Sequence, residues 1–148
     1  MKILIILIAS LMFGIPGQTG QGKSGIGNDT ARISIAFKQD TMAPGDSGLI
    51  LINFKPEENY FINMEPVPYV KLDSNKIIAS IGKIKPEMSK KPEYIDASRP
   101  VKLPITVRKD VKSGKYEIKG TLTYFICSGT DGLCSKFKHP FSLKITIR

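Results

Sequence analysis

The sequence contains no tryptophan, a single histidine and only two cysteines, and its acidic residues are scarcer than its basic ones. One histidine excludes any mechanism that needs a histidine-rich metal site or a second histidine base. A length of 148 residues excludes a large multidomain enzyme, and 41% hydrophobic with 24% charged residues excludes a disordered or collagen-like chain. The chain is therefore expected to form one globular domain with an ordinary core.

The first residues have the pattern of an export signal. Met1 and Lys2 form a short positive start, an apolar run over residues 3–15 follows, and the chain then turns polar. This pattern predicts a secretory signal peptide over residues 1–20 and a flexible leader, rich in glycine, serine and glutamine, over residues 21–30. The run is shorter than the roughly 20 residues that a membrane-spanning helix needs, so we expect no stable membrane span and a periplasmic or secreted location.

The formal net charge is +9 at pH 7, from 22 lysines and arginines against 13 acidic residues. The lysines are spread along the chain without interleaved aromatic residues or a nucleic-acid-binding motif. We therefore expect no nucleic acid as a partner. The lysines are interpreted as the solvated outward faces of strands, with some attraction to acidic partners or membrane surfaces.

The polarity pattern is that of β-strands. Apolar and polar residues alternate with a period of two over residues 31–37 and 101–107, which predicts strands with one buried face. No convincing amphipathic helix appears. Further strands are predicted around residues 49–54, 60–63, 70–72 and 77–81. Short strands at this spacing predict an all-β, immunoglobulin-like antiparallel β-sandwich over residues 31–148.

The last part of the chain predicts a β-hairpin that places Cys127 opposite Cys134, with residues 128–133 as its loop. This register aligns the apolar stripes of the two strands on the buried side. It also sets Glu117 against Lys144 on the exposed side. By strand alternation, both cysteines are expected to lie on the outward, exposed face at the loop end of the hairpin.

The residues alone leave two roles open for this cysteine pair. A disulfide that closes so short a loop would act as a structural staple worth about 2.5 kcal/mol in the chain-entropy model. Directly opposed strand residues have Cβ atoms about 4.5–5.5 Å apart, whereas a relaxed disulfide needs about 3.8 Å, so the bridge could also be tense and easily reduced. Exposure and the nearby Lys136, Lys138 and His139 would then favour thiolate formation.

A third alternative is a metal site formed by Cys127, Cys134 and His139. Thiolates and imidazole can hold copper or zinc. The spacing of these three residues does not match a familiar metal site, and a lone histidine is more often an ordinary surface residue. We therefore expect neither a metal nor another cofactor.

Several segments resemble one family of redox proteins. The segment over residues 120–134, with the strands LPITV over residues 103–107 and NYFIN over residues 59–63, is similar to the amino-terminal periplasmic domain of the DsbD family of thiol:disulfide interchange proteins. The resemblance covers about residues 31–148 and implies an immunoglobulin-like fold. It implies that Cys134 enters the mixed disulfide, that Cys127 resolves it, and that no cofactor is required.

The resemblance also implies partners and supporting residues. The family shields its disulfide with a mobile cap loop, to which Glu87 and Met88 correspond, while Phe61 and Asn63 correspond to positions near the cysteines. The implied partners are thioredoxin-like redox proteins and a membrane electron donor, with electrons passed to disulfide isomerases and cytochrome c maturation proteins. The chain would then be a component of a protein-disulfide reductase system. The alternative is a non-catalytic secreted binding module whose hairpin carries a structural disulfide.

Overall fold

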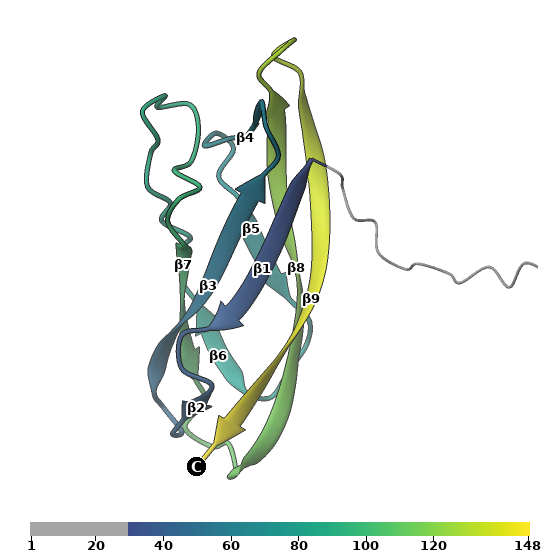
Figure 1. The fold of residues 1–148 in the computed structure, drawn as a ribbon. Coiled ribbons are helices and arrows are strands. Elements are labelled where there is room, and N and C mark those ends of the chain that lie inside the picture. Colours follow the sequence, from purple (N-terminus) through teal and green to yellow (C-terminus); the bar gives the residue numbers. More distant parts are fainter. Residues whose placement is uncertain (1–29) are drawn as a thin grey trace, which may run out of the picture.

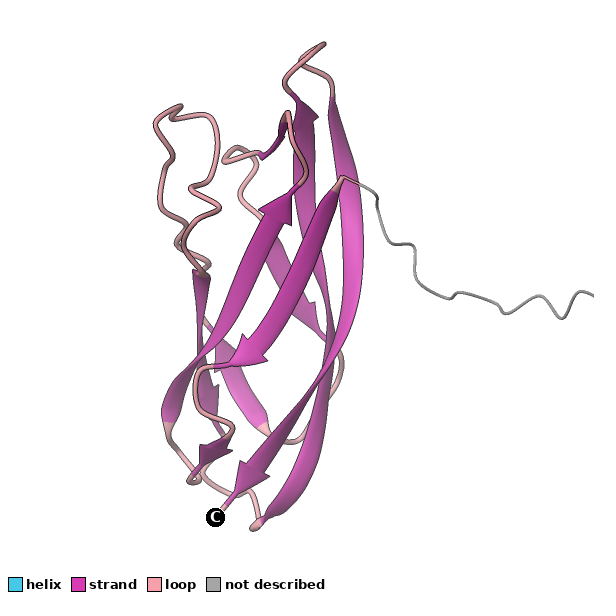
Figure 2. Ribbon diagram, viewed as in Figure 1, coloured by secondary structure: helices cyan, strands magenta, loops and turns pink. Residues whose placement is uncertain are grey.

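The computed structural model describes residues 30–148, so the predicted signal peptide and nearly all of the predicted leader lie outside the described residues. The described part of the chain consists of strands joined by loops (Figure 2). It contains no helix long and apolar enough to span a membrane. The predicted fold class, an immunoglobulin-like antiparallel β-sandwich, is confirmed.

Two sheets form the sandwich (Figure 1). The first has the strand order β1-β3-β7-β6, with bounds Ala31–Phe37, Ser47–Pro56, Val101–Val107 and Ile78–Ile81. The second has the order β2-β9-β8-β4, with bounds Thr41–Met42, Cys134–Ile147, Gly114–Ser128 and Tyr60–Ile62, and strand β5 (Tyr69–Leu72) also pairs with β8. All pairings are antiparallel except that of β2 with β9, which is parallel. The two-residue strand β2 was not predicted.

The core lies between the two sheets and follows from the period-two patterns. Strand β7 alternates buried and outward positions along its length, as its sequence predicts. The largest fully buried aliphatic side chains are Ile50, Ile52, Ile62, Leu103, Ile105, Ile118, Leu122, Ile145 and Ile147. Burial of one such side chain contributes roughly 1.5–3 kcal/mol, so these residues account for much of the stability of the sandwich.

The β8–β9 hairpin has the predicted register. The strands pair without a shift from Gly114 opposite Ile147 to Cys127 opposite Cys134, and Glu117 faces Lys144. These are the longest strands of the fold, with 15 and 14 residues. The loop end of the hairpin lies at the same end of the sandwich as strand β4 and the β6–β7 loop, at the top of Figure 1.

Strand β9 is an edge strand over most of its length. Strand β2 covers it only at Thr146 and Ile147, close to the carboxyl end. Within the described residues, no other strand pairs with β9 on the side away from β8. Cys134 and Pro140 therefore lie on an open sheet edge, whereas β8 is an interior strand between β9 and β4.

Candidate functional site

Cys127 and Cys134 form a disulfide across the β8–β9 hairpin. The two residues are directly opposed in the last register pair before the loop. Their Cα atoms are 4.0 Å apart, whereas disulfides usually join Cα atoms 4.4–6.8 Å apart. The bridge therefore joins neighbouring strands of one sheet and makes no link between the two sheets.

The two halves of this disulfide differ in exposure. The expectation that both cysteines are exposed is wrong for Cys127, which is only 1% exposed, and correct for Cys134. The reason is the position of the strands. Strand β4 pairs with β8 so that Phe61 lies opposite Cys127, whereas Cys134 has no strand beside it on the open edge. Opposed residues of neighbouring strands have side chains on the same face, so Phe61 lies beside Cys127.

Aromatic stacking holds Phe61 in place. Its ring stacks on Tyr94, with 4.8 Å between the ring centroids and 19° between the ring planes. The ammonium of Lys91 lies 5.0 Å from the centroid of the Phe61 ring, a cation–π contact. A side chain at Gly129 would collide with Phe61, since a Cβ there would lie 2.7 Å from the ring carbon Cε2. Phe61 is thus fixed between the hairpin and the β6–β7 loop.

Local hydrogen bonds order the turn that joins the two cysteines. The Ser128 amide donates to the Leu133 carbonyl at 2.9 Å, and Gly132 has a φ of 71°, which favours glycine. The Asp131 carboxylate accepts the Leu133 amide at 3.0 Å. This bond, together with one from Ser128, lowers the pKa of Asp131 below its ordinary value. The turn therefore holds Cys134 in register and keeps a negative charge at the hairpin tip.

His139 does not join the cysteines. It lies farther along β9, opposite the buried Leu122 and hence on the core side of the strand. Burial lowers the pKa of His139, which favours the neutral imidazole. No group of three His, Cys, Asp or Glu residues within the described range is arranged to hold a metal ion. Strand alternation thus places the imidazole on the other face of the sheet from Cys134.

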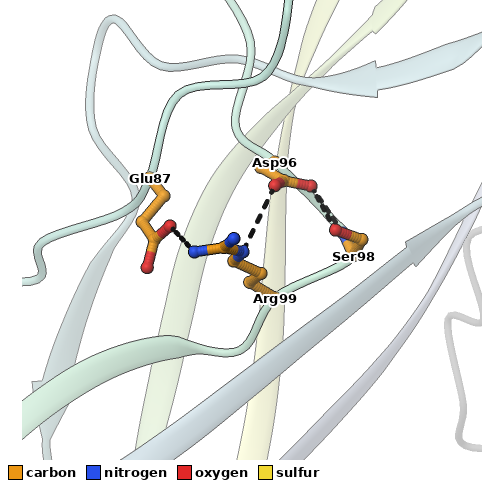
Figure 3. A network of polar contacts seen from close by, with 4 residues as sticks. All are labelled: Glu87, Asp96, Ser98 and Arg99. Carbon is orange, nitrogen blue, oxygen red and sulfur yellow. Dashed lines mark hydrogen bonds and ion pairs between the residues drawn. The ribbon is translucent and has the colours of Figure 1, made fainter.

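The predicted cap residues, Glu87 and Met88, lie on the loop between β6 and β7. Glu87 forms an ion pair with Arg99 at 2.5 Å, and Arg99 also lies 3.8 Å from Asp96, which accepts the Ser98 hydroxyl (Figure 3). Met88 pairs with Ile95 across the same loop and is 65% exposed. The loop is thus closed on itself by polar contacts, with Met88 on its surface.

Backbone bonds attach this loop to the strand beside the disulfide. The Ile95 amide donates to the Ile62 carbonyl at 2.9 Å, and the Met64 amide donates to the Glu93 carbonyl at 2.8 Å. Asn63 continues the pairing of β4 with β8, since its amide donates to the Phe125 carbonyl at 2.9 Å. Its side-chain amide donates to the carbonyl of Glu65.

Phe61 and Met88 line one open groove of about 880 Å³ between strand β4 and the β6–β7 loop. Neither cysteine lines it. The structure therefore brings together Cys127, Cys134 and Phe61, places Asn63 two residues beyond Phe61 with Ile62 between them, and leaves Met88 across the groove. Glu87 is directed to Arg99.

Two residues of this region were not singled out from the sequence. Leu133 directly precedes Cys134 and is 70% exposed, an apolar side chain at the tip of a polar turn. The sequence feature that could have indicated it is a single apolar residue in a turn otherwise made of Ser, Gly, Thr and Asp. Tyr94 stacks on Phe61, but the residues around Tyr94 in the sequence do not indicate this contact. The contact forms because the β6–β7 loop folds back to strand β4, more than 30 residues earlier in the chain.

Comparison with known proteins finds matches among solved structures but not among sequences. No family model and no curated protein sequence matches the chain. The ZirS C-terminal domain matches with a TM-score of 0.41 and 16% identity over 99% of this chain and 94% of that one. A chain of the cohesin–dockerin complex of Clostridium thermocellum matches with a TM-score of 0.40 and 16% identity, over 78% of this chain and 99% of that one. The reduced amino-terminal domain of Neisseria meningitidis DsbD matches with a TM-score of 0.40 and 14% identity, over 77% of this chain and 90% of that one. These similarities assign neither a family nor an activity.

Proposed function

We propose that the chain is a thiol:disulfide exchange module that passes electrons through the Cys127–Cys134 disulfide. The observation that carries the proposal is the asymmetry of the bridge. Cys134 is exposed on an open sheet edge, while Cys127 is buried beside Phe61. Thiol:disulfide exchange depends on which sulfur an incoming thiolate can reach. We therefore expect a partner thiolate to attack the sulfur of Cys134, the exposed residue of the pair.

Reduction of the module takes two exchange steps. A donor thiolate attacks Sγ of Cys134, the bond between the two cysteines breaks, and Cys127 leaves with the electron pair and takes up a proton. A second donor thiol then attacks the donor sulfur of the mixed disulfide and releases Cys134 as a thiolate. The donor leaves as a disulfide, and the module has gained two electrons and one proton, with a second proton taken up where the Cys134 thiolate is protonated.

Transfer to an acceptor runs through the same sulfur. The Cys134 thiolate attacks one sulfur of the acceptor disulfide and forms a mixed disulfide. Cys127, held 4.0 Å away between the Cα atoms, then attacks Sγ of Cys134 and restores the internal disulfide. The acceptor leaves as a dithiol. No cofactor takes part in either direction.

The surroundings support this chemistry. Lys136 is the next outward-facing residue after Cys134 on β9, and a nearby cation stabilises a thiolate. The resemblance of residues 120–134 to the DsbD family agrees with the proposal and implies thioredoxin-like partners and a membrane electron donor. A disulfide persists in oxidising compartments, which agrees with a periplasmic or secreted location.

The test is the reduction potential of the pair. The purified protein is equilibrated with glutathione and dithiothreitol buffers, and the free thiols are trapped and counted. We expect a value between about −120 and −270 mV, the range of exchange proteins. A value below about −300 mV would mark the bridge as a structural staple and overturn the proposal.

One observation favours the alternative of a non-catalytic binding module with a structural disulfide. Burial of Cys127 beside Phe61 protects one sulfur, as in an inert bridge. In that case reduction only removes the staple, and the reduced protein transfers no electrons to another disulfide. Mixing the reduced protein with oxidised thioredoxin and following the thiols of both proteins separates the two functions.

A further inference from the structure

The outward face of the β9-β8-β5 part of the sheet carries a row of lysines that begins next to Cys134. Lys136 and Lys138 are the next two outward positions of β9, and Lys71 of β5 joins them across β8. All three side chains are exposed. Outward positions on one strand are about 7 Å apart, so Lys136 lies within about one Debye length of Cys134 at physiological salt. We call Lys71, Lys136 and Lys138 the basic face.

Within the described residues, no carboxylate forms an ion pair with any lysine of the basic face. The far end of the same sheet differs, because Glu117 lies 3.5 Å from Lys119 there and faces Lys144. Asp131 at the hairpin tip contributes one negative charge, and its hydrogen bonds keep it ionised. The three lysines of the basic face outnumber this charge and none of them is ion-paired, so the surface next to Cys134 has a positive balance.

An exposed aromatic side chain lies within the basic face. Tyr69 is 48% exposed and pairs with Thr123, which in turn pairs with Lys138. A hydrogen bond with Thr123 and the positive charge of Lys136 lower the pKa of Tyr69 below its ordinary value. Exposed aromatic residues such as tyrosine are enriched at protein interfaces.

We propose that the basic face is the docking surface for a redox partner whose reactive cysteine lies beside a cluster of Asp and Glu side chains. The inference rests on the proposed function, since it names the chemistry of the partner that reacts with Cys134. Charge complementarity carries it, because three exposed lysines that form no ion pair begin one outward position from Cys134. Complementary charge raises the encounter rate and orients the partner's cysteine toward Cys134.

The test uses two synthetic peptides of equal length with one central cysteine, flanked by glutamates in one and by lysines in the other. Each peptide reduces the oxidised protein, and the second-order rate constant is divided by that of neutral 2-mercaptoethanol. At 10 mM salt we expect the acidic peptide to react about 10-fold faster than the basic one. At 0.5 M salt the ratio should fall to about twofold or less, because screening then shortens the Debye length.

The variant Lys71→Glu, Lys136→Glu, Lys138→Glu should reverse the preference. Its matched control changes three exposed lysines elsewhere, Lys55→Glu, Lys83→Glu, Lys102→Glu, with the same change of net charge. The control should keep the preference of the unaltered protein. An equal effect of both variants would mean that only the total charge matters and would overturn the proposal.

Two further outcomes would also overturn it. One is equal rates for the two peptides at low salt together with normal reduction by 2-mercaptoethanol. This result would contradict an acidic partner and would still agree with the exchange function. The other is equal peptide rates together with binding to phosphatidylglycerol vesicles that the basic-face variant loses, which assigns the lysines to a membrane surface. Failure of the exchange function itself is recognised separately, by a reduction potential below about −300 mV.

Discussion

Strands β8 and β9 contribute one cysteine each to the same disulfide, yet their surroundings are opposite. Strand β8 is an interior strand, and Cys127 on it is buried beside Phe61. Strand β9 is an edge strand at the loop end of the hairpin, where Cys134 is exposed and the exposed Lys136 and Lys138 follow it. The number of neighbouring strands, and not the parity of the residue, decides which sulfur a partner can reach.

Under the proposed function, this difference gives the two cysteines different roles. The exposed Cys134 would receive or make the attack, and the buried Cys127 would leave and return without meeting other thiols. A hairpin with two exposed cysteines would offer both sulfurs to a partner and would give two mixed disulfides.

The largest expected effect comes from separating the two thiols. In Cys127→Ser the only thiol is Cys134, and in Cys134→Ser it is Cys127. Because Cys127 reacts only in molecules that have opened locally, at a cost of about 2–3 kcal/mol, we expect it to react on the order of 100-fold more slowly with a chromogenic disulfide. Stopped-flow absorbance measures both rates.

The same two variants in concentrated urea provide the control. Unfolding exposes Cys127, so the two thiols should then react with the chromogenic disulfide at similar rates. Equal rates in the folded state would contradict the asymmetry on which the direction of attack depends. Mass spectrometry of the mixed disulfides would then show attack at both sulfurs.

A smaller effect is expected when the cover of Cys127 is removed. Phe61→Ala, made in the Cys134→Ser background, opens the face of β8 next to the buried thiol. We expect the Cys127 thiol to react about 10-fold faster, and the free energy of unfolding to fall by about 2 kcal/mol because a half-buried phenyl ring is lost. Urea denaturation measures the second value.

A matched control separates the two effects of that variant. Phe137 is also half-buried and stacks on Tyr124 with 5.9 Å between ring centroids, but it lies on the core side of β9. Phe137→Ala in the same background should lower stability to a similar degree without the rise in thiol reactivity. If both variants raise the reactivity equally, general loosening of the hairpin, and not the Phe61 cover, protects Cys127.

The smallest effect concerns pH and strand β9. Burial lowers the pKa of His139 below its ordinary value of 6.5, so the unfolded chain binds a proton at a higher pH than the folded one. The stability contributed by neutral His139 is present above about pH 6.5 and is lost as the pH falls below it toward the lowered native pKa. Urea denaturation between pH 5 and 8 should show this loss, and His139→Gln should reduce it. An unchanged pH profile in the variant would assign the dependence to another group.

Much of the fold could be predicted because it depends on local alternation. The stripes of β8 and β9, and the charges of Glu117 and Lys144, determine the register that brings Cys127 and Cys134 together. The two-residue strand β2 could not be predicted, since so short a strand has no period.

The burial of Cys127 was missed for a different physical reason. Strand alternation assigns the face on which a side chain lies but not what covers that face. The cover comes from Phe61 on β4, whose ring stacks on Tyr94 of the β6–β7 loop, and long-range pairing brings both segments to the hairpin. The placement of Cys134 on an open edge likewise depends on the order of strands in the sheet.

The open edge beside Cys134 has a consequence for the behaviour of many molecules together. Unpaired strand edges recruit strands from other chains and begin aggregation, a hazard that natural proteins limit with lysine and proline at the edge. Strand β9 carries both, because Lys136 and Lys138 repel a second copy and Pro140 has no amide hydrogen to offer it. Cys134 thus lies exposed on a bare sheet edge that these residues protect against pairing with another chain.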